Sequence, residues 1–375
     1  MVGAGIVGAA VARALAKTGH KVTVLEKGMA GGAVTGASLA CIGTHMIDRD
    51  ELPLLKWSCR VWADLAQDAP IDIQYLRCGQ IRFIDREDDL PVAQSWIEAE
   101  RAQGLEPTLL EPDDVRRLEP ALTGKIVAAT HSPGDAVVNP FLAVRALLRD
   151  ARENGADIRT RAAVEQIVLS GERIAGVRLG NDLVPADAVV LASGPWTARL
   201  ASTCGVDLPI RPRKAQCLAT VALPLTVHTV VGACESAGGV EAGYTQIQQA
   251  PSGQILFNTV LAGGLSEEGA QDETPEVNAA FVVESIETLL RLFPSLACVD
   301  LLRSWVRFEA VASDDRFLIG PVGPAGLFIA AGDSGTGFVR APAIGHLIQQ
   351  MLTDEEASFR TDLYAPGRFA GQGTS

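Results

Sequence analysis

The sequence predicts an α/β fold in which a parallel-sheet domain is interrupted by a mostly antiparallel β domain. Two glycine-rich turns, each placed before an apolar helix, lie near the two ends of the chain, at residues 3–8 and 332–337. A third apolar strand, at residues 186–191, also stops at a glycine turn. Between these segments, residues 215–260 break into short strands separated by turns, which is typical of an antiparallel sheet. One domain is therefore expected to be assembled from separate parts of the chain.

The first turn has the pattern G-x-G-x-x-G, formed by Gly3, Gly5 and Gly8. The first glycine permits a tight turn, the second lets the backbone approach a pyrophosphate, and the third lets helix and strand pack closely. An apolar helix and a β-branched strand follow, in the order of a Rossmann-like dinucleotide-binding unit. Glu26 ends that strand, where a carboxylate accepts hydrogen bonds from ribose hydroxyls and favours FAD or NAD over NADP. A plain glycine turn with a solvated Glu26 is the alternative, which the ordered pattern disfavours.

Only Met1 and Val2 precede this turn. A parallel strand that is buried on both faces normally spans about five residues. We therefore expect the native amino terminus to lie several residues upstream of Met1, which sequencing of the native protein would test.

Composition narrows the class of protein. The 375 residues suffice for two domains, and 47% hydrophobic content with a mean hydropathy of +0.19 indicates a globular chain without an 18-residue apolar run. A net charge of -13 disfavours nucleic acids and anionic membranes as partners. The seven dispersed cysteines contain no C-x-x-C pair, so we expect reduced thiols, a cytoplasmic protein and no metal site.

The helices expected from start signals and apolar periodicity are few. Asn139 with Pro140 predicts the start of a helix that runs to about Asn154. Asp50 is expected to cap a second helix, in which Trp57 and Trp62 are interpreted as core residues rather than ligand-stacking ones. Further helices are expected at residues 91–103, 111–118, 275–293 and 338–352. The expected strands are a hairpin over residues 72–84 and single strands at 157–160, 164–170, 176–179, 186–191, 301–311 and 327–331.

The second glycine-rich turn, Gly332–Gly337, follows a buried strand and opens the last helix. An ordinary strand–helix turn is the alternative interpretation. Two such turns in one chain suit an extended cofactor that is contacted at both ends. They disfavour a simple NAD-binding Rossmann protein.

Four segments together resemble the D-amino-acid oxidase superfamily of FAD enzymes, whose similar members include glycine oxidase, the sarcosine oxidase β subunit, and subunits of opine and hydroxyproline dehydrogenases. The segments are VGAGIVGAAVARALAKTGHKVTVLEK, VVNPFLAVRALL, ADAVVLASGPW and GLFIAAGDSGTGFVRAPAIGHLI. The resemblance implies a Rossmann-like FAD-binding domain of the glutathione-reductase type at residues 1–45, 139–215 and 300–375. It implies an interrupting substrate domain at residues 46–138 and 216–299.

The resemblance also implies an extended FAD whose ring lies between the two domains. Glu26 would contact the adenosine ribose, Val164 the adenine side and Ser38 the flavin. The remaining implied contacts are Gly3, Gly5, Gly8, Ser193 and Gly194 at the diphosphate, and Gly335, Thr336 and Gly337 near flavin N1 and the C2 carbonyl.

The last of these contacts has a chemical reason. A flavin that accepts a hydride at N5 gains negative charge along N1–C2=O, which a helix N-terminus stabilises by about 0.3–2 kcal/mol. Preorganised N–H donors in a dry site add about 3–4 kcal/mol. If the substrate amine arrives neutral, no protein base is required, and none is assigned from the sequence.

Two departures from the family pattern matter. Where some relatives attach flavin through a histidine or cysteine, this chain has neither, at residues 38–40 and 331–333, so non-covalent FAD is expected. Relatives that oxidise simple amino acids carry a carboxylate-binding arginine before a D-G-x-P-x-I-G segment. In this chain its place falls on Glu309, ahead of Asp314–Gly320.

The strand that carries Glu309 is compatible with more than one class of substrate. Arg303, Trp305, Arg307 and Glu309 alternate, so on a strand they share one face. Either Arg307 binds a substrate carboxylate while Glu309 meets a cationic group, or the two neutralise each other and the substrate is not a simple amino acid. A strand that is turned away from the cavity is the third possibility. Arg340 is a further candidate anchor.

The sequence therefore favours an FAD-dependent enzyme that oxidises the C–N bond of an amino acid or secondary amine. The hypothesis for its substrate is an opine-like amino acid derivative. The alternative is a flavin-carrying scaffold or electron-relay subunit of a heteromeric dehydrogenase. Oxygen and a partner protein both stay open as electron acceptors.

Overall fold

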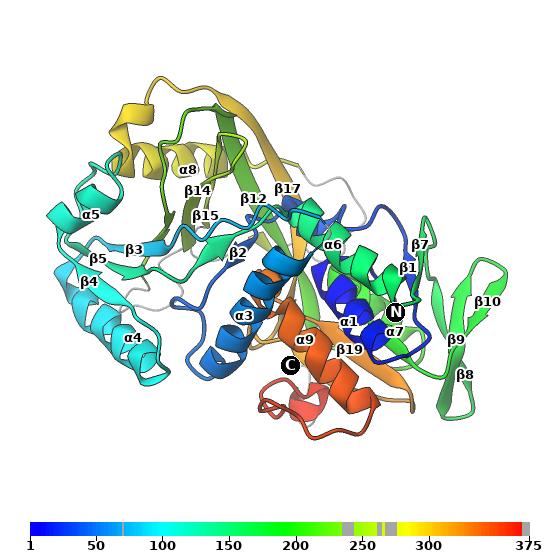
Figure 1. Ribbon diagram of the computed structural model, residues 1–375. Helices are drawn as coiled ribbons and strands as arrows, with labels where there is room; N and C mark the ends of the chain where they lie inside the picture. Colours follow the sequence, from blue (N-terminus) through cyan, green and yellow to red (C-terminus); the bar gives the residue numbers. More distant parts are fainter. Residues whose placement is uncertain (70, 235–243, 261–264, 267–275, 370–375) are drawn as a thin grey trace.

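The computed structural model describes residues 1–69, 71–234, 244–260, 265–266 and 276–369 (Figure 1). Figure 1 shows a half with long helices beside β1 and β19, and a second half built on a broad sheet with β3, β14 and β15. The bounds of the strands in the first half are β1 (Thr23–Glu26), β7 (Asp157–Thr160), β11 (Val189–Leu191), β18 (Leu318–Pro321) and β19 (Leu327–Ala331).

Val2 occupies the middle of the first sheet. It forms single parallel bridges to Leu25 of β1 on one side and to Leu191 of β11 on the other. The strand order is thus β7, β1, Val2, β11, β19 and β18, in which only the β18–β19 pair is antiparallel. The predicted parallel α/β sheet is confirmed.

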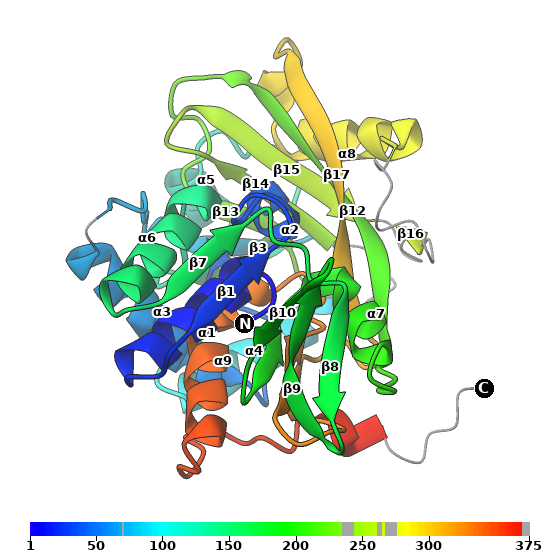
Figure 2. The ribbon, with the colours of Figure 1, turned by 90° about the vertical axis from the view of Figure 1, so that its right-hand side faces the viewer.

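Two layers cover this sheet because adjacent strand residues point to opposite faces. Val24 and Val190 face the helices α1 (Ile6–Lys17), α6 (Pro140–Glu153) and α9 (Gly337–Leu352). Leu25 and Leu191 face a three-stranded antiparallel sheet formed by β8 (Gln166–Ser170), β9 (Arg173–Leu179) and β10 (Asp182–Pro185), which Figure 2 shows in front. Burial on both faces explains why the central strands are continuous apolar runs.

The second half contains a large, mostly antiparallel sheet, as predicted. Its order is β16 (Leu265–Ser266), β12 (Ile210–Ala222), β15 (Gln254–Val260), β14 (Tyr244–Gln249), β13 (Val230–Ala233), β3 (Gln80–Ile84), β5 (Ala128–Ser132) and β4 (Thr108–Leu110), and β17 (Leu301–Ala312) pairs with β12. Among these described strands, only β13 and β3 run parallel. The helices of this half are α4 (Leu90–Ala102), α5 (Pro112–Leu118) and α8 (Ala279–Leu292).

The ladder between β12 and β17 runs through both halves, from Ile210–Ala312 to Thr220–Leu301 (Figure 2). Ile210 and Ala312 belong to the core beneath the first sheet, whereas Leu218 packs in the core beside α8. The division into two domains stays a proposal, and its boundary at residue 215 falls inside β12. The remaining short elements are α2 (Val34–Ala37), α3 (Leu52–Asp68), α7 (Thr197–Ser202), β2 (Cys41–Ile42) and β6 (Ala136–Val137).

Several local predictions can be compared with the structure. The Asn139 side chain caps α6 by accepting hydrogen bonds from the N–H groups of Phe141 and Leu142, at 3.1 and 3.2 Å. Residues 72–84 do not form a hairpin, because β3 pairs with the distant β5 and β13 instead. The helix expected over residues 275–293 is α8, and Pro275 lies outside the described residues.

The N-terminal end of α3 also differs from its prediction. Asp50 does not cap the helix, since Glu51 takes the N-cap position and Asp50 pairs with Arg316 at 2.9 Å. Trp62 is fully buried, and its indole N–H donates a hydrogen bond to the Phe338 carbonyl at 3.0 Å. The core role predicted for Trp62 is therefore confirmed.

All seven cysteines are free thiols. Within the described ranges, no helix combines the length and apolarity needed to cross a bilayer. The same ranges hold no cluster of three or more histidine, cysteine or acidic side chains arranged for a metal ion.

Candidate active site

A pocket of about 450 Å³ extends from the first glycine turn to the N-terminus of α9. It brings together residues from β1, α1, α2, α7, β17, β19 and α9, which are far apart in the sequence. Ten of the predicted site residues line it: Gly3, Gly5, Glu26, Ser38, Val164, Ser193, Gly194, Glu309, Gly335 and Gly337. Gly8, Arg307, Thr336 and Arg340 are not part of its lining.

The glycine turn is shaped by close backbone contacts. Gly3 has φ +99°, and a Cβ on it would overlap the carbonyl oxygen of Ala192. A Cβ on Gly8 would overlap the carbonyl oxygen of Gly3. Gly8 therefore supports the turn through helix–strand packing, although it does not itself reach the pocket.

The N-terminus of α1 faces this turn. Gly5 is its N-cap residue and carries no side chain that could occupy the position, while Thr35 Oγ1 accepts a hydrogen bond from the Ile6 N–H at 3.0 Å. A helix N-terminus attracts anions through its free N–H groups and its dipole. The turn thus fits the pyrophosphate of a dinucleotide.

Glu26 lies where a ribose would be recognised. Its two carboxylate oxygens accept hydrogen bonds from the N–H groups of Ala4 and Gly28, each at 2.8 Å. A carboxylate has about four acceptor positions, so it can also accept hydrogen bonds from ribose hydroxyls. Close by, the Lys27 ammonium lies 3.3 Å from the centroid of the Trp196 ring, and both residues line the pocket.

At the other end of the pocket, Glu309 of β17 is paired with Arg213 of β12. Arg213 Nη2 donates to Glu309 Oε2 at 2.9 Å and to the Ser334 carbonyl at 3.2 Å. The two residues are direct partners in the antiparallel ladder. The place that relatives use for a carboxylate-binding arginine therefore holds a carboxylate with its own guanidinium partner.

Asp333, in the second glycine turn, also lines this end of the pocket. Burial and, next to it, the neighbouring Glu309 charge raise the pKa of Asp333 to about 7, against smaller opposing contributions from a backbone hydrogen bond, Arg340 and Arg213. Glycines make room for both acids. A Cβ on Gly335 would lie 3.1 Å from Glu309 Oε1, and a Cβ on Gly337 would lie 2.5 Å from Asp333 Oδ2.

Arg307 and Arg340 do not take the positions expected from the sequence. Arg307 shares a strand face with Glu309, but its guanidinium turns back to the Val306 carbonyl at 2.7 Å and the residue is exposed. Arg340 is buried with Glu51 on α3, whose Oε2 accepts from Arg340 Nε at 2.7 Å. Arg340 also donates to the Thr336 hydroxyl, and Thr336 is not part of the pocket lining.

Sequence reasoning missed two residues of this site. Asp333 was visible as the acid inside the second glycine turn, but its position gave no indication of a role. Arg213 gave no signal, because its contact with Glu309 depends on the register of two strands that are 96 residues apart in the chain. Asp333 and Glu309 thus place two carboxylates in the lining at this end of the pocket, and the Arg213 guanidinium holds the second of them from outside the lining.

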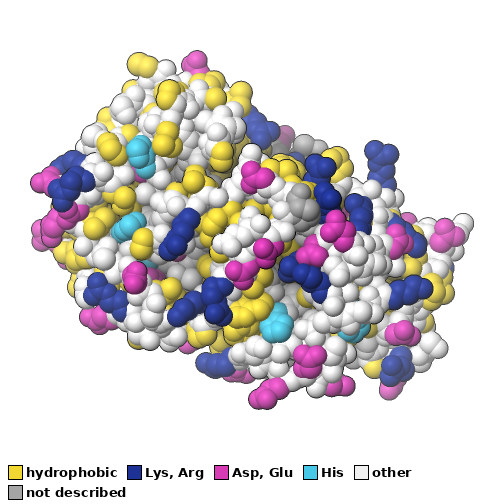
Figure 3. Space-filling model, in the orientation of Figure 1, with side chains coloured by type: hydrophobic (Ala, Val, Ile, Leu, Met, Phe, Trp, Pro, Cys, Tyr) yellow, Lys and Arg dark blue, Asp and Glu magenta, His cyan; other side chains and the backbone are white. Residues whose placement is uncertain are grey.

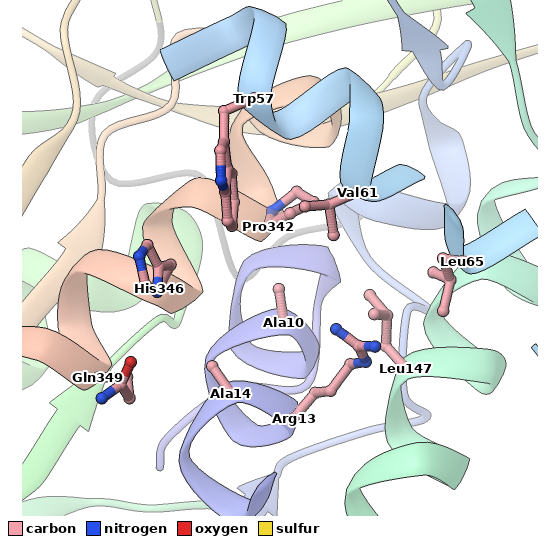
Figure 4. Close-up of a pocket in the computed structure, with 10 residues that line it drawn as sticks. All are labelled: Ala10, Arg13, Ala14, Trp57, Val61, Leu65, Leu147, Pro342, His346 and Gln349. Carbon is pink, nitrogen blue, oxygen red and sulfur yellow. The ribbon is translucent and has the colours of Figure 1, made fainter. Parts of the chain in front are cut away.

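A smaller hollow of about 190 Å³ lies between α1, α3, α6 and α9, on the other side of the helical layer (Figure 4). Its wall contains Trp57, which stacks on His346 with the ring centroids 5.0 Å apart. Arg13 at its edge already pairs with Asp150, whose carboxylate is 2.5 Å away. The surface over these helices carries interspersed acidic and basic side chains (Figure 3). The larger pocket is therefore the candidate active site.

The chain is similar to several known proteins. Over residues 1–351 the chain matches the family described as "DAO: FAD dependent oxidoreductase". It is 28% identical to 4-methylaminobutanoate oxidase (formaldehyde-forming) of Paenarthrobacter nicotinovorans, over 99% of this chain but only 45% of that protein. It is 24% identical to the sarcosine oxidase subunit beta of an Arthrobacter species, over 95% of this chain and 87% of that one.

A solved structure is similar over the whole chain. The glycine oxidase of Geobacillus kaustophilus superposes with a TM-score of 0.86 and 25% identity, over 98% of this chain and 97% of that one. The two proteins thus share one fold over almost their whole length. The chain belongs to the DAO family and is an FAD-dependent oxidoreductase.

Proposed function

We propose that the protein oxidises the C–N bond of a secondary or N-substituted amine to an imine, with FAD bound non-covalently in the large pocket. Bound FAD supplies the hydride acceptor. The observation that carries the proposal is the Glu309–Arg213 pair. It holds an acid in the pocket lining at the end opposite the first glycine turn. An acid at this position suits a substrate with a positively charged nitrogen.

The same pair argues against glycine or D-alanine as substrate. A substrate carboxylate 4 Å from an unpaired Glu309 would be repelled by about 4 kcal/mol at an effective dielectric constant near 20. Arg213 lowers this repulsion, but its guanidinium is already shared between Glu309 and the Ser334 carbonyl. We therefore infer a substrate with a cationic amine near Glu309, such as an opine, whose carboxylates lie elsewhere in the cavity.

Two further observations support the proposal. The N-terminus of α9 opens at Gly337 with no acid in its first turn, so its dipole favours negative charge on a bound ligand. The relative 4-methylaminobutanoate oxidase is named for an N-methylated amine. We propose a substrate of the same chemical class for this chain.

The test is anaerobic reduction of the purified yellow protein. N-methyl amines, N-carboxyalkyl amino acids, glycine and D-alanine are each added without oxygen, and the loss of visible flavin absorbance is followed. We expect fast bleaching with N-substituted amines and slow or no bleaching with glycine and D-alanine. The reverse order would contradict the proposed substrate class, and no bleaching by any amine would contradict the reaction itself.

The alternative is a subunit that carries FAD within a heteromeric dehydrogenase. The resemblance to a sarcosine oxidase β subunit over 95% of this chain supports it. The two hypotheses predict different behaviour of the isolated chain when a substrate is added. An amine oxidase or dehydrogenase subunit with its own active site bleaches alone, whereas a relay subunit accepts electrons only after its partner is added.

A further inference from the structure

Asp333 is an acid at the Glu309 end of the pocket to which the proposed function gives no task. It stands in the turn between β19 and α9, is half-buried, and lines the same end of the pocket as Glu309. Glu309 is engaged by two hydrogen bonds from Arg213, at 2.9 and 3.3 Å. Within the described part of the chain, no side chain donates a hydrogen bond to the Asp333 carboxylate, which is a difference between the two acids.

A cationic amine cannot lose a hydride until its nitrogen has lost a proton. The nitrogen lone pair must be free to form the C=N bond as the C–H electron pair departs. A secondary ammonium has a pKa well above neutrality, comparable to that of a lysine side chain near 10.4. Near neutral pH the active site must therefore either select the rare neutral amine or remove the proton itself.

We propose that the Asp333 carboxylate accepts this proton from the cationic amine substrate. The inference rests on the proposed function. The ammonium N–H bond breaks and an O–H bond forms on Asp333, so the positive charge on nitrogen and the negative charge on the acid cancel. With the nitrogen lone pair free, the C=N bond could form as the C–H electron pair departs, and bound FAD would supply the acceptor for that pair. The protons and electrons balance with no further reactant.

The surroundings of Asp333 suit this role. Glu309 on β17 contributes a negative charge, while Arg213 on β12 and Arg340 on α9 contribute positive ones. Burial and the negative charge of Glu309 outweigh the two positive charges, so the pKa of Asp333 is raised to about 7. A base is most effective when its pKa lies near the working pH, because it is then both available and strong enough to take the proton.

The architecture of the turn keeps this acid in place. The Asp333 carbonyl accepts hydrogen bonds from the Thr336 N–H and hydroxyl, both at 3.0 Å, which closes the turn at the start of α9. Gly337 leaves the space that the carboxylate occupies. Arg340 donates a hydrogen bond to the Thr336 hydroxyl, so it is a positioning residue for the turn.

The first test is the pH dependence of anaerobic flavin reduction at saturating 4-methylaminobutanoate, or at the fastest amine found in the screen. In the wild type the rate should rise with pH through an ionisation near 7. Asp333→Asn should be slower by about 10²-fold near neutral pH. Its deficit should shrink as the pH approaches the pKa of the amine, because the neutral amine then binds directly, and a merely structural defect would not be rescued in this way.

Glu309→Gln is the second variant, and it acts on the same ionisation without altering Asp333. Removal of the neighbouring negative charge should move the midpoint of the rate profile to lower pH. Asp315→Asn is the matched control. Asp315 Oδ1 lies 3.8 Å from Arg213 Nη1, but its side chain is 63% exposed and outside the pocket lining, so the midpoint should not move.

A readout without turnover accompanies the kinetics. The visible spectrum of the oxidised holoenzyme is titrated with pH in the absence of substrate. We expect a spectral midpoint near 7 in the wild type, a lower one in Glu309→Gln and none in Asp333→Asn. Far-UV circular dichroism and FAD content show that each variant is folded and loaded.

The outcomes separate this inference from the function on which it rests. Reduction of the wild type by an amine, with the same pH profile in Asp333→Asn, would overturn the role of Asp333 alone. An unshifted midpoint in Glu309→Gln would overturn it as well. If no amine reduces the wild type, the proposed function fails and this inference fails with it.

Discussion

Glu309 of β17 and Arg213 of β12 face each other directly across an antiparallel ladder and share a charge-assisted hydrogen bond of 2.9 Å. Glu309 lines the pocket at the end that lies near the second glycine turn, and Arg213 holds it from outside the lining. The guanidinium holds the carboxylate at a fixed place, and the acid thereby becomes a defined feature of the pocket wall. It sets the charge that a substrate meets.

The first prediction concerns substrate selection by this acid. Glu309→Gln keeps the size of the side chain and removes its charge. We expect the KM of cationic, N-substituted amines to rise about 10- to 100-fold, which corresponds to about 1.5–3 kcal/mol for a hydrogen bond with a charged partner. The KM of neutral substrates should change little. Steady-state kinetics with both classes check this, and equal changes for both would mean that Glu309 does not contact the substrate nitrogen.

The second prediction concerns the ribose side of the pocket. Glu26→Ala removes an acceptor of the Ala4 and Gly28 N–H groups as well as the ribose contact, so FAD should bind more weakly by roughly 1–3 kcal/mol. Glu26→Gln keeps one acceptor oxygen and should give an intermediate loss. Titration of the FAD-free protein with FAD measures both. Asp157→Ala, an exposed acid on β7, serves as the control and should leave the affinity unchanged.

The third prediction is that FAD is held without a covalent bond. The turn that precedes α9 offers Ala331, Gly332 and Asp333, none of which forms the thioether or imidazole linkage used for covalent flavin. Acid precipitation should release the yellow chromophore into the supernatant as intact FAD. Colour that stays with the precipitated protein would show a covalent attachment.

The fourth prediction concerns the ion pair beneath the second glycine turn. Arg340 and Glu51 are buried, with side chains 6% and 0% exposed, so Glu51→Ala leaves a guanidinium without its partner. Unfolding in denaturant should show a loss of about 3–5 kcal/mol. The double variant Glu51→Met with Arg340→Met should be less destabilised than the single one. Asp362→Ala breaks an exposed pair with Arg360 and should change nothing measurable. A double variant as unstable as Glu51→Ala would contradict the ion-pair account.

The fifth prediction follows from the raised pKa of Asp333. Between its ordinary pKa of 3.8 and about 7, the folded chain holds a proton that the unfolded chain releases, so stability falls as the pH rises through this window. Asp333→Asn has no such penalty. The FAD-free variant should be more stable than the wild type by about 1–3 kcal/mol at pH above 7. The difference should vanish below pH 4. A stability difference that is independent of pH would show that Asp333 ionises normally.

Local chemistry explains what the sequence could predict. Gly3 and Gly8 were recognisable because a dinucleotide turn requires close backbone contacts, and in the structure a Cβ on either would overlap a carbonyl oxygen. Asn139 was recognisable because a side-chain oxygen before a proline satisfies free N–H groups at a helix start. The strand over residues 327–331 ended at the predicted residues, since a glycine turn follows it directly.

Long-range pairing explains what the sequence could not predict. The sequence of residues 72–84 predicts a hairpin of two neighbouring strands, but β3 pairs with the distant strands β5 and β13 instead. Arg307 and Glu309 share a strand face, yet only the neighbour across the ladder decides which of them is held at the pocket, and that neighbour is Arg213 for Glu309 and Ala215 for Arg307. Alternation along one strand decides which of its faces is buried, but it does not identify the distant strand with which it pairs.

The contact of Trp62 with the Phe338 carbonyl has a wider consequence. The Glu51–Arg340 pair makes a second contact of the same kind. The N-cap of α3 and the middle of this helix are therefore both held to the first turns of α9, which begins at the second glycine turn. We expect a displacement of α3 to move the backbone of the second glycine turn, Gly332–Gly337, through these two contacts. A substitution on the outer surface of α3 is then expected to alter the rate of oxidation, although no residue of α3 lines the pocket.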